Sequence, residues 1–142
     1  MMKDNIIFRK VWEDADLMEL KIICSSSVAA AISEIYVSNS LIDELAAQIK
    51  QFLQGTREEG LWANESRGNG STACVSLRFF RKDKLGHIIV EVFAELDDGG
   101  DYAKHNCCFF VNTEYGLLME FCNKLVKLKI NPVGCEIQLN HA

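Results

Sequence analysis

The feature of this chain that most constrains its fold is a pattern that occurs twice, 76 positions apart. In each copy an apolar, β-branched or aromatic segment runs through polar capping residues into an amphipathic helix, over residues 35–53 and again over residues 109–128. The spacing places one apolar stripe on each helix, ready to pack on a sheet. The matching stripe positions are Leu41, Leu45, Ile49 and Phe52 in the first copy and Leu117, Phe121, Leu125 and Leu128 in the second.

Alternation of apolar and polar residues predicts strands around the two helices. The predicted strands are an antiparallel meander over residues 6–12, 18–24 and 29–37, a hairpin over 72–95, a strand over 104–111 and a short edge strand over 136–139. We expect helices over residues 41–53 and 114–129, with Ser40 as the N-cap of the first and Gly55 at its C-terminal end. The prediction is an α+β fold in a single domain over residues 1–142. It has one six-stranded, mostly antiparallel sheet (β-β-β-α-β-β-β-α) with both helices on one face.

Composition argues against several classes of protein. The chain has 142 residues, of which 49% are hydrophobic and 25% charged, as is typical of a globular protein. Its net charge of -5 argues against nucleic acid as a partner, because nucleic-acid binding requires a basic face. No apolar run approaches the roughly 20 residues of a membrane span, and no signal-peptide core follows the first residues. We therefore expect a cytoplasmic protein without a membrane partner.

The six cysteines and three histidines form no recognisable site in the sequence. There is no Cys-x-x-Cys pair, and the adjacent Cys107 and Cys108 point to opposite faces of a strand. We expect reduced thiols that pack as small apolar side chains, and no metal. The Asp-Asp-Gly-Gly-Asp segment at 97–101 fits an inter-strand turn better than a calcium loop. No nucleophile motif or phosphate-binding loop occurs, so we expect neither an enzyme nor a cofactor.

Acidic residues are concentrated in one part of the chain. Residues 13–65 include ten acidic and three basic side chains, while the rest of the chain has ten acidic and twelve basic ones. This asymmetry indicates either a solvated face that keeps the protein soluble or a surface that attracts a basic protein. For the second case, the predicted partner-binding residues are Glu13, Asp14, Asp16, Glu58, Glu59 and Trp62.

The irregular segment over residues 56–71 allows two interpretations of Trp62. Either Leu61 and Trp62 anchor the segment to the core, or Trp62 is an exposed anchor for a partner, framed by the acidic residues. A segment of this length also gives an alternative function, a small-molecule-binding domain or enzyme with a pocket under residues 56–71.

A sheet face that the helices leave uncovered gives a further hypothesis. Exposed apolar side chains on such a face favour burial against another surface. A homodimer through this face would cover Phe80, Ile89, Phe93 and Phe110.

The order of elements, and especially Ile35-Tyr36-Val37-Ser38 before the helix over 41–53, resembles a known family. It is similar to the small cytoplasmic immunity proteins of bacterial contact-dependent toxin systems, and most to the family around the wall-associated toxin's immunity protein. The resemblance covers roughly residues 18–129. It implies a non-enzymatic protein that binds and neutralises a toxin domain, often a nuclease, with an acidic stretch that mimics nucleic acid toward a basic toxin.

Overall fold

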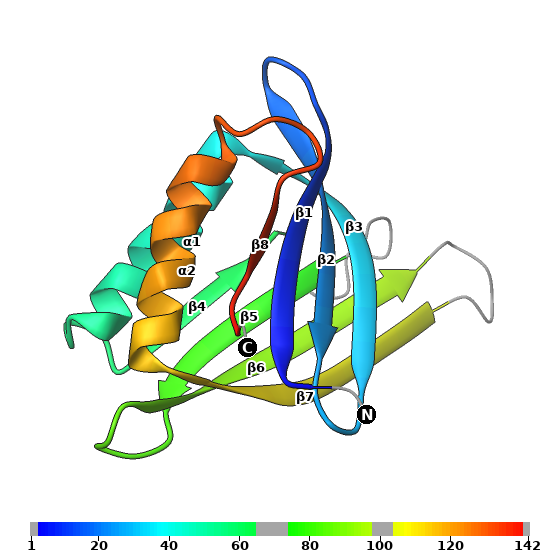
Figure 1. Ribbon diagram of the computed structural model, residues 1–142. Coiled ribbons are helices and arrows are strands. Elements are labelled where there is room, and N and C mark those ends of the chain that lie inside the picture. Colours follow the sequence, from blue (N-terminus) through cyan, green and yellow to red (C-terminus); the bar gives the residue numbers. More distant parts are fainter. Residues whose placement is uncertain (1–2, 65–73, 98–103, 141–142) are drawn as a thin grey trace.

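The computed structural model describes residues 3–64, 74–97 and 104–140, which form an α+β structure (Figure 1). Its strands lie in two four-stranded antiparallel sheets, with the orders β3-β2-β1-β8 and β4-β5-β6-β7. The elements are β1 (Asn5–Glu13), β2 (Leu17–Ser25), β3 (Ala30–Ser38), α1 (Asn39–Leu53), β4 (Glu59–Ala63), β5 (Cys74–Arg81), β6 (His87–Asp97), β7 (Lys104–Glu114), α2 (Tyr115–Leu128) and β8 (Glu136–Gln138).

The prediction of one six-stranded sheet is wrong, although the α+β class and the antiparallel pairing are confirmed. The predicted meander is β1-β2-β3, and the predicted hairpin is β5-β6. After each helix, however, the chain crosses to the other sheet: β4 follows α1 and pairs with β5, and β8 follows α2 and pairs with β1. The alternation within a strand records which side chains are buried. It does not record which strand lies beside it.

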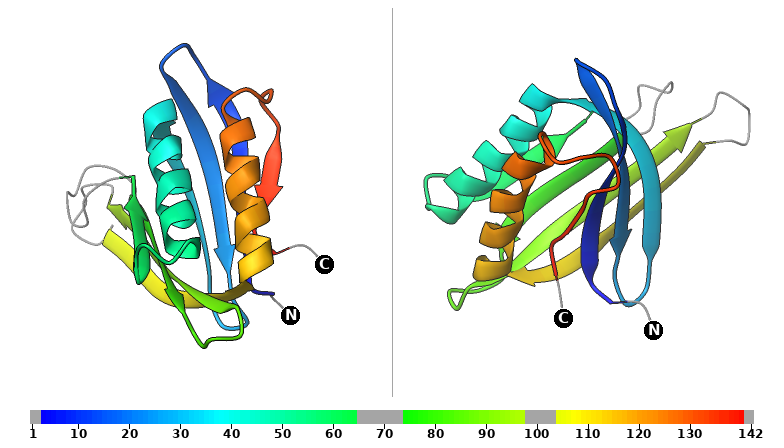
Figure 2. Two further views of the ribbon diagram at one scale, coloured as in Figure 1. Left: turned by 90° about the vertical axis from the view of Figure 1, so that its left-hand side faces the viewer. Right: turned by 45° about the horizontal axis from the view of Figure 1, so that its top comes forward.

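The two halves of the chain repeat one order of elements: three strands, a helix and a short strand. Each strand of the first half has the same place in its sheet as its counterpart in the second half. The first sheet has the order β3-β2-β1-β8, and the second, written in reverse, has the order β7-β6-β5-β4. The helices run antiparallel, side by side (Figure 2). They meet where the Cys122 thiol donates to the carbonyl oxygen of Ala46, 76 positions earlier, at 3.4 Å. The repeat in the sequence therefore coincides with a repeat of the fold.

Capping residues set the ends of α1. The N-cap is Ser38, whose hydroxyl oxygen accepts the N–H of Leu41 at 3.2 Å. The prediction of Ser40 as N-cap is wrong, because Ser40 lies within the first turn. The C-cap is Gln54 and not the expected Gly55, which follows it with φ +83°, a conformation that glycine adopts without strain.

The core is one cluster of buried apolar side chains from both sheets and both helices. The ring of Phe8 lies edge-on to Phe121 of α2, with centroids 5.4 Å apart, and 6.4 Å from Trp62 of β4. Both helices cover the same side of the two sheets (Figures 1 and 2). In the part of the chain that the structure describes, neither helix is long and apolar enough to cross a membrane.

Candidate protein-binding surface

Trp62 lies in the core and is only 4% exposed. Its indole N–H donates to the carbonyl oxygen of Leu41 at 3.0 Å. The interpretation of Trp62 as an exposed anchor is therefore wrong. The other interpretation, that Leu61 and Trp62 both anchor the segment to the core, is confirmed for Trp62 and wrong for Leu61. The segment forms a short strand, β4, in which Trp62 points inward and Leu61, 57% exposed, points outward.

The predicted acidic residues lie at opposite ends of α1. We call Glu13, Asp14 and Asp16 the first acidic group, and Glu58 and Glu59 the second. The first lies at the end of β1 and in the turn before β2, next to Leu17, which pairs with the N-cap of α1, Ser38. The second follows the other end of α1, which has 15 residues and is about 22 Å long. The two groups therefore do not frame one anchor, and Glu59 instead pairs with Arg78 at 3.0 Å.

A different tryptophan lies beside the first acidic group. Trp12, at the end of β1, is 44% exposed, and its ring packs edge-on against that of Tyr36 on β3, with centroids 6.1 Å apart. Tyr36 is 58% exposed. Glu19 of the intervening strand β2 is next to both residues, because it pairs in register with each of them. We call the exposed side chains of Trp12, Leu17 and Tyr36 the aromatic patch.

A β-bulge brings Trp12 to the outer face of the first sheet. Lys10 pairs with Leu20 and Trp12 with Glu19, so Val11 is an extra residue in β1. Without the bulge, alternation from the buried Lys10 would place Trp12 inside. Sequence reasoning missed Trp12 for this reason. Tyr36 could have been found, because its phase in β3 is opposite to that of the buried residues around it.

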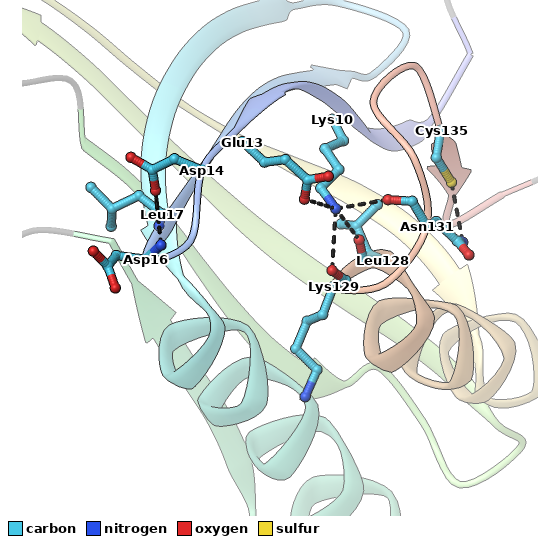
Figure 3. A network of polar contacts seen from close by, with 9 residues as sticks. All are labelled: Lys10, Glu13, Asp14, Asp16, Leu17, Leu128, Lys129, Asn131 and Cys135. Atoms are coloured by element: carbon cyan, nitrogen blue, oxygen red, sulfur yellow. Dashed lines mark hydrogen bonds and ion pairs between the residues drawn. The ribbon is translucent and has the colours of Figure 1, made fainter.

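A buried lysine holds this end of β1 next to α2 (Figure 3). The ammonium of Lys10 donates to the carbonyl oxygens of Leu128, Lys129 and Asn131 at 3.0, 3.2 and 2.8 Å. It also pairs with the carboxylate of Glu13 at 2.5 Å. The carbonyls lie at the C-terminal end of α2, where helices have unsatisfied acceptors and favour a cation. Glu13, predicted to bind a partner, is thus part of a structural network.

Asp14 orders the turn that follows (Figure 3). Its carboxylate oxygen accepts the N–H groups of Leu17 and Asp16, both at 2.8 Å. These bonds, chiefly that from Leu17, hold the pKa of Asp14 below its ordinary value. The turn therefore presents the ionised carboxylate of Asp14 beside the aromatic patch.

The surroundings of the aromatic patch are acidic. On the same face Arg9 is paired with Glu136 at 2.6 Å, and Lys21 pairs in register with Glu34, so each of these two basic side chains lies next to a carboxylate. We call the nearby carboxylates the acidic rim: Asp14, Asp16, Glu19 and Glu34. Two large aromatic rings beside clustered carboxylates can pack against apolar side chains and attract Lys or Arg, both by charge and through the ring faces.

The cysteines are free thiols. Burial, with a smaller contribution from Cys107, raises the pKa of Cys24 to about 12. Cys107 is half-buried and Cys108 exposed, which confirms that they point to opposite faces. Within the described residues there is no group of three or more His, Cys, Asp or Glu side chains able to hold a metal ion. Most of the predicted turn at 97–101 lies outside those residues.

The structure describes only part of the predicted pocket under residues 56–71, because residues 65–71 lie outside the described ranges. The described residues leave a hollow of about 220 Å³ between α1 and β4. Ligand sites usually measure roughly 300–1,000 Å³. This hollow is therefore a weaker candidate than the aromatic patch.

Comparison of the chain with protein-family models, with curated proteins and with solved structures finds no match. The resemblance to toxin immunity proteins, which depends on element order and helix position, therefore stays a prediction.

Proposed function

We propose that this chain is a non-enzymatic protein-binding module that binds a basic protein through the aromatic patch and the acidic rim. The observation that carries the proposal is the half-exposed, edge-on pair of Trp12 and Tyr36 beside four carboxylates. Trp and Tyr are enriched among the residues that dominate binding energy at protein interfaces. A surrounding acidic rim speeds association with a basic partner and makes it sensitive to salt.

The aromatic patch is held in place by contacts within the chain, which supports the same proposal. The bulge at Val11, the Lys10 network and the Asp14 turn hold the patch in one arrangement before any partner binds. A preformed surface loses less conformational entropy on binding. As partner class we propose the basic toxin domain, often a nuclease, that the resemblance to immunity proteins implies, with this chain in the cytoplasm of the protected bacterium.

The test is a titration of the chain with the toxin domain encoded beside its gene. Trp12→Ala and Tyr36→Ala should each weaken binding by about 2 kcal/mol, roughly thirtyfold, and change the free energy of unfolding little. Asp16→Lys should mainly slow association. Leu85→Ala is the matched control, because Leu85 is an exposed apolar residue outside the patch. Equal affinities for Trp12→Ala and Leu85→Ala would contradict the proposal.

A second experiment serves where no toxin gene lies nearby. In pull-downs at low salt, the wild type used as bait should recover a basic protein that the Trp12→Ala variant does not. Recovery of no specific partner by the wild type would count against a binding module.

The alternative, a small-molecule-binding domain or an enzyme with a pocket under residues 56–71, has the hollow between α1 and β4 as its support. A ligand that binds the folded state raises the melting temperature. A thermal-shift screen against metabolites therefore tests it, and a screen without a hit would remove its support.

A further inference from the structure

The outer face of the second sheet carries a row of side chains with a symmetric chemistry. Leu61, Arg78, Glu91 and Phe110 pair in register, one from each strand in the order β4-β5-β6-β7. The two ends of the row are apolar and about half exposed, Leu61 at 57% and Phe110 at 50%. At its centre the guanidinium of Arg78 binds the carboxylate of Glu91 at 2.9 Å. The row thus reads apolar, cation, anion, apolar.

The neighbouring row is also complementary to itself when its order is reversed. Glu59, Phe80, Ile89 and Asn112 pair in register across the same four strands. This row reads acid, aromatic, aliphatic, amide. The rings of Phe80 and Phe110 lie edge-on at 6.4 Å and join the two rows into one surface. Phe93, the other residue of the predicted homodimer face, follows on β6 in the same outward phase.

We infer that this face binds a second copy of the chain in a twofold homodimer. The axis would run along the strands, between β5 and β6, and would place β4 of each copy over β7 of the other. Each row then meets its own reverse. Leu61 lies over Phe110 and Arg78 over Glu91 of the second copy, and in the neighbouring row Phe80 lies over Ile89.

Complementarity of charge argues for a second copy as the occupant. In a twofold interface the same patch must match itself. With the row reversed, Arg78 of each copy lies over Glu91 of the other, whereas without reversal like charges would meet. Two sheets packed face to face lie about 10 Å apart, so long side chains such as Arg78 reach across. The aromatic patch lies on the other sheet, so the dimer leaves it accessible and does not depend on the proposed function.

The test measures mass by light scattering and sedimentation equilibrium over a range of concentrations. The wild type should approach twice the chain mass of 16.0 kDa as concentration rises. Arg78→Glu and Glu91→Arg should each be monomeric, because each places like charges opposite one another. Their equimolar mixture should dimerise, because both cross-pairs are then attractive. A mixture that stays monomeric would overturn the twofold arrangement.

Phe110→Asp tests the face without changing the central charges. It should weaken self-association at least tenfold, whereas Ile32→Asp, an exposed strand position on the first sheet, should not. Circular dichroism and melting curves check that the variants fold, and Trp12→Ala should dimerise like the wild type. A wild type that is monomeric at millimolar concentration, or a dimer unaffected by Phe110→Asp, would overturn the inference.

Discussion

Replacing Lys10 with methionine measures what its buried ammonium contributes to stability. Methionine retains most of the apolar stem, so the loss is confined to three hydrogen bonds to carbonyls and the ion pair with Glu13. The carbonyls of Lys129 and Asn131 are partly exposed and can bind water instead, but that of Leu128 is buried with its partner. An unsatisfied buried acceptor costs about 1–3 kcal/mol, and loss of the ion pair with Glu13, whose carboxylate is 39% exposed, adds about 1 kcal/mol.

We therefore expect Lys10→Met to lower the free energy of unfolding by about 3 kcal/mol. With an unfolding entropy of about 2.1 cal/mol/K per residue, this lowers the melting temperature by about 10 °C. Urea titration and calorimetry measure the two quantities.

Two matched variants serve as controls. Lys21→Met, on the outer face of the first sheet, should change stability by less than about 0.5 kcal/mol. Arg81→Met removes the corresponding cap in the other half, where Arg81 donates to the Phe52 carbonyl at 2.7 Å. It should cost about 1 kcal/mol, since this cation is exposed. If Lys10→Met were within 1 kcal/mol of the wild type, desolvation of the ammonium would offset its bonds and the reasoning would be refuted.

Three further predictions concern the core, the thiols and the turn. Trp62→Ala should lower the free energy of unfolding by about 3–5 kcal/mol in urea titration, because Trp62 is a core residue, and a loss under 1 kcal/mol would contradict its burial. A thiol reagent at pH 8 should label Cys108 first and Cys24 only after unfolding, since the pKa of Cys24 is about 12, as mass spectrometry can show. The lowered pKa of Asp14 stabilises the folded state above the ordinary carboxyl pKa, and this contribution disappears as the pH falls below about 4. Asp14→Ala should therefore lose less stability than the wild type between pH 5 and pH 2, and identical losses would contradict the sign.

Local periodicity in the sequence predicted most of the elements, because an apolar stripe every three to four residues or every second residue reflects one buried face. It could not predict how the strands divide between two sheets. That division depends on β4 and β8, which have five and three residues and pair with strands of the other half.

The candidate surface was predicted only in part. The acidic turn was found from charge alone, but the aromatic residue assigned to it was Trp62 and not Trp12. Five residues of β4 among polar neighbours do not show which face is buried, and the bulge at Val11 reverses the phase of Trp12. The fully buried Lys10 left a readable signal, since it continues the inward phase of Ile6 and Phe8.

Pairing of β8 with β1 brings the two ends of the described chain together in one sheet (Figure 1). The amide of Asn5 donates to that of Gln138, 133 positions later, at 3.2 Å. Closing a loop of that length costs about 4 kcal/mol of chain entropy. On the ribosome the first sheet is therefore completed only after β8 has been made. Until then β1 has an unpaired edge, which is a template for association with other chains. The interval between synthesis of β3 and of β8 is therefore when this edge of the nascent chain is open to such association.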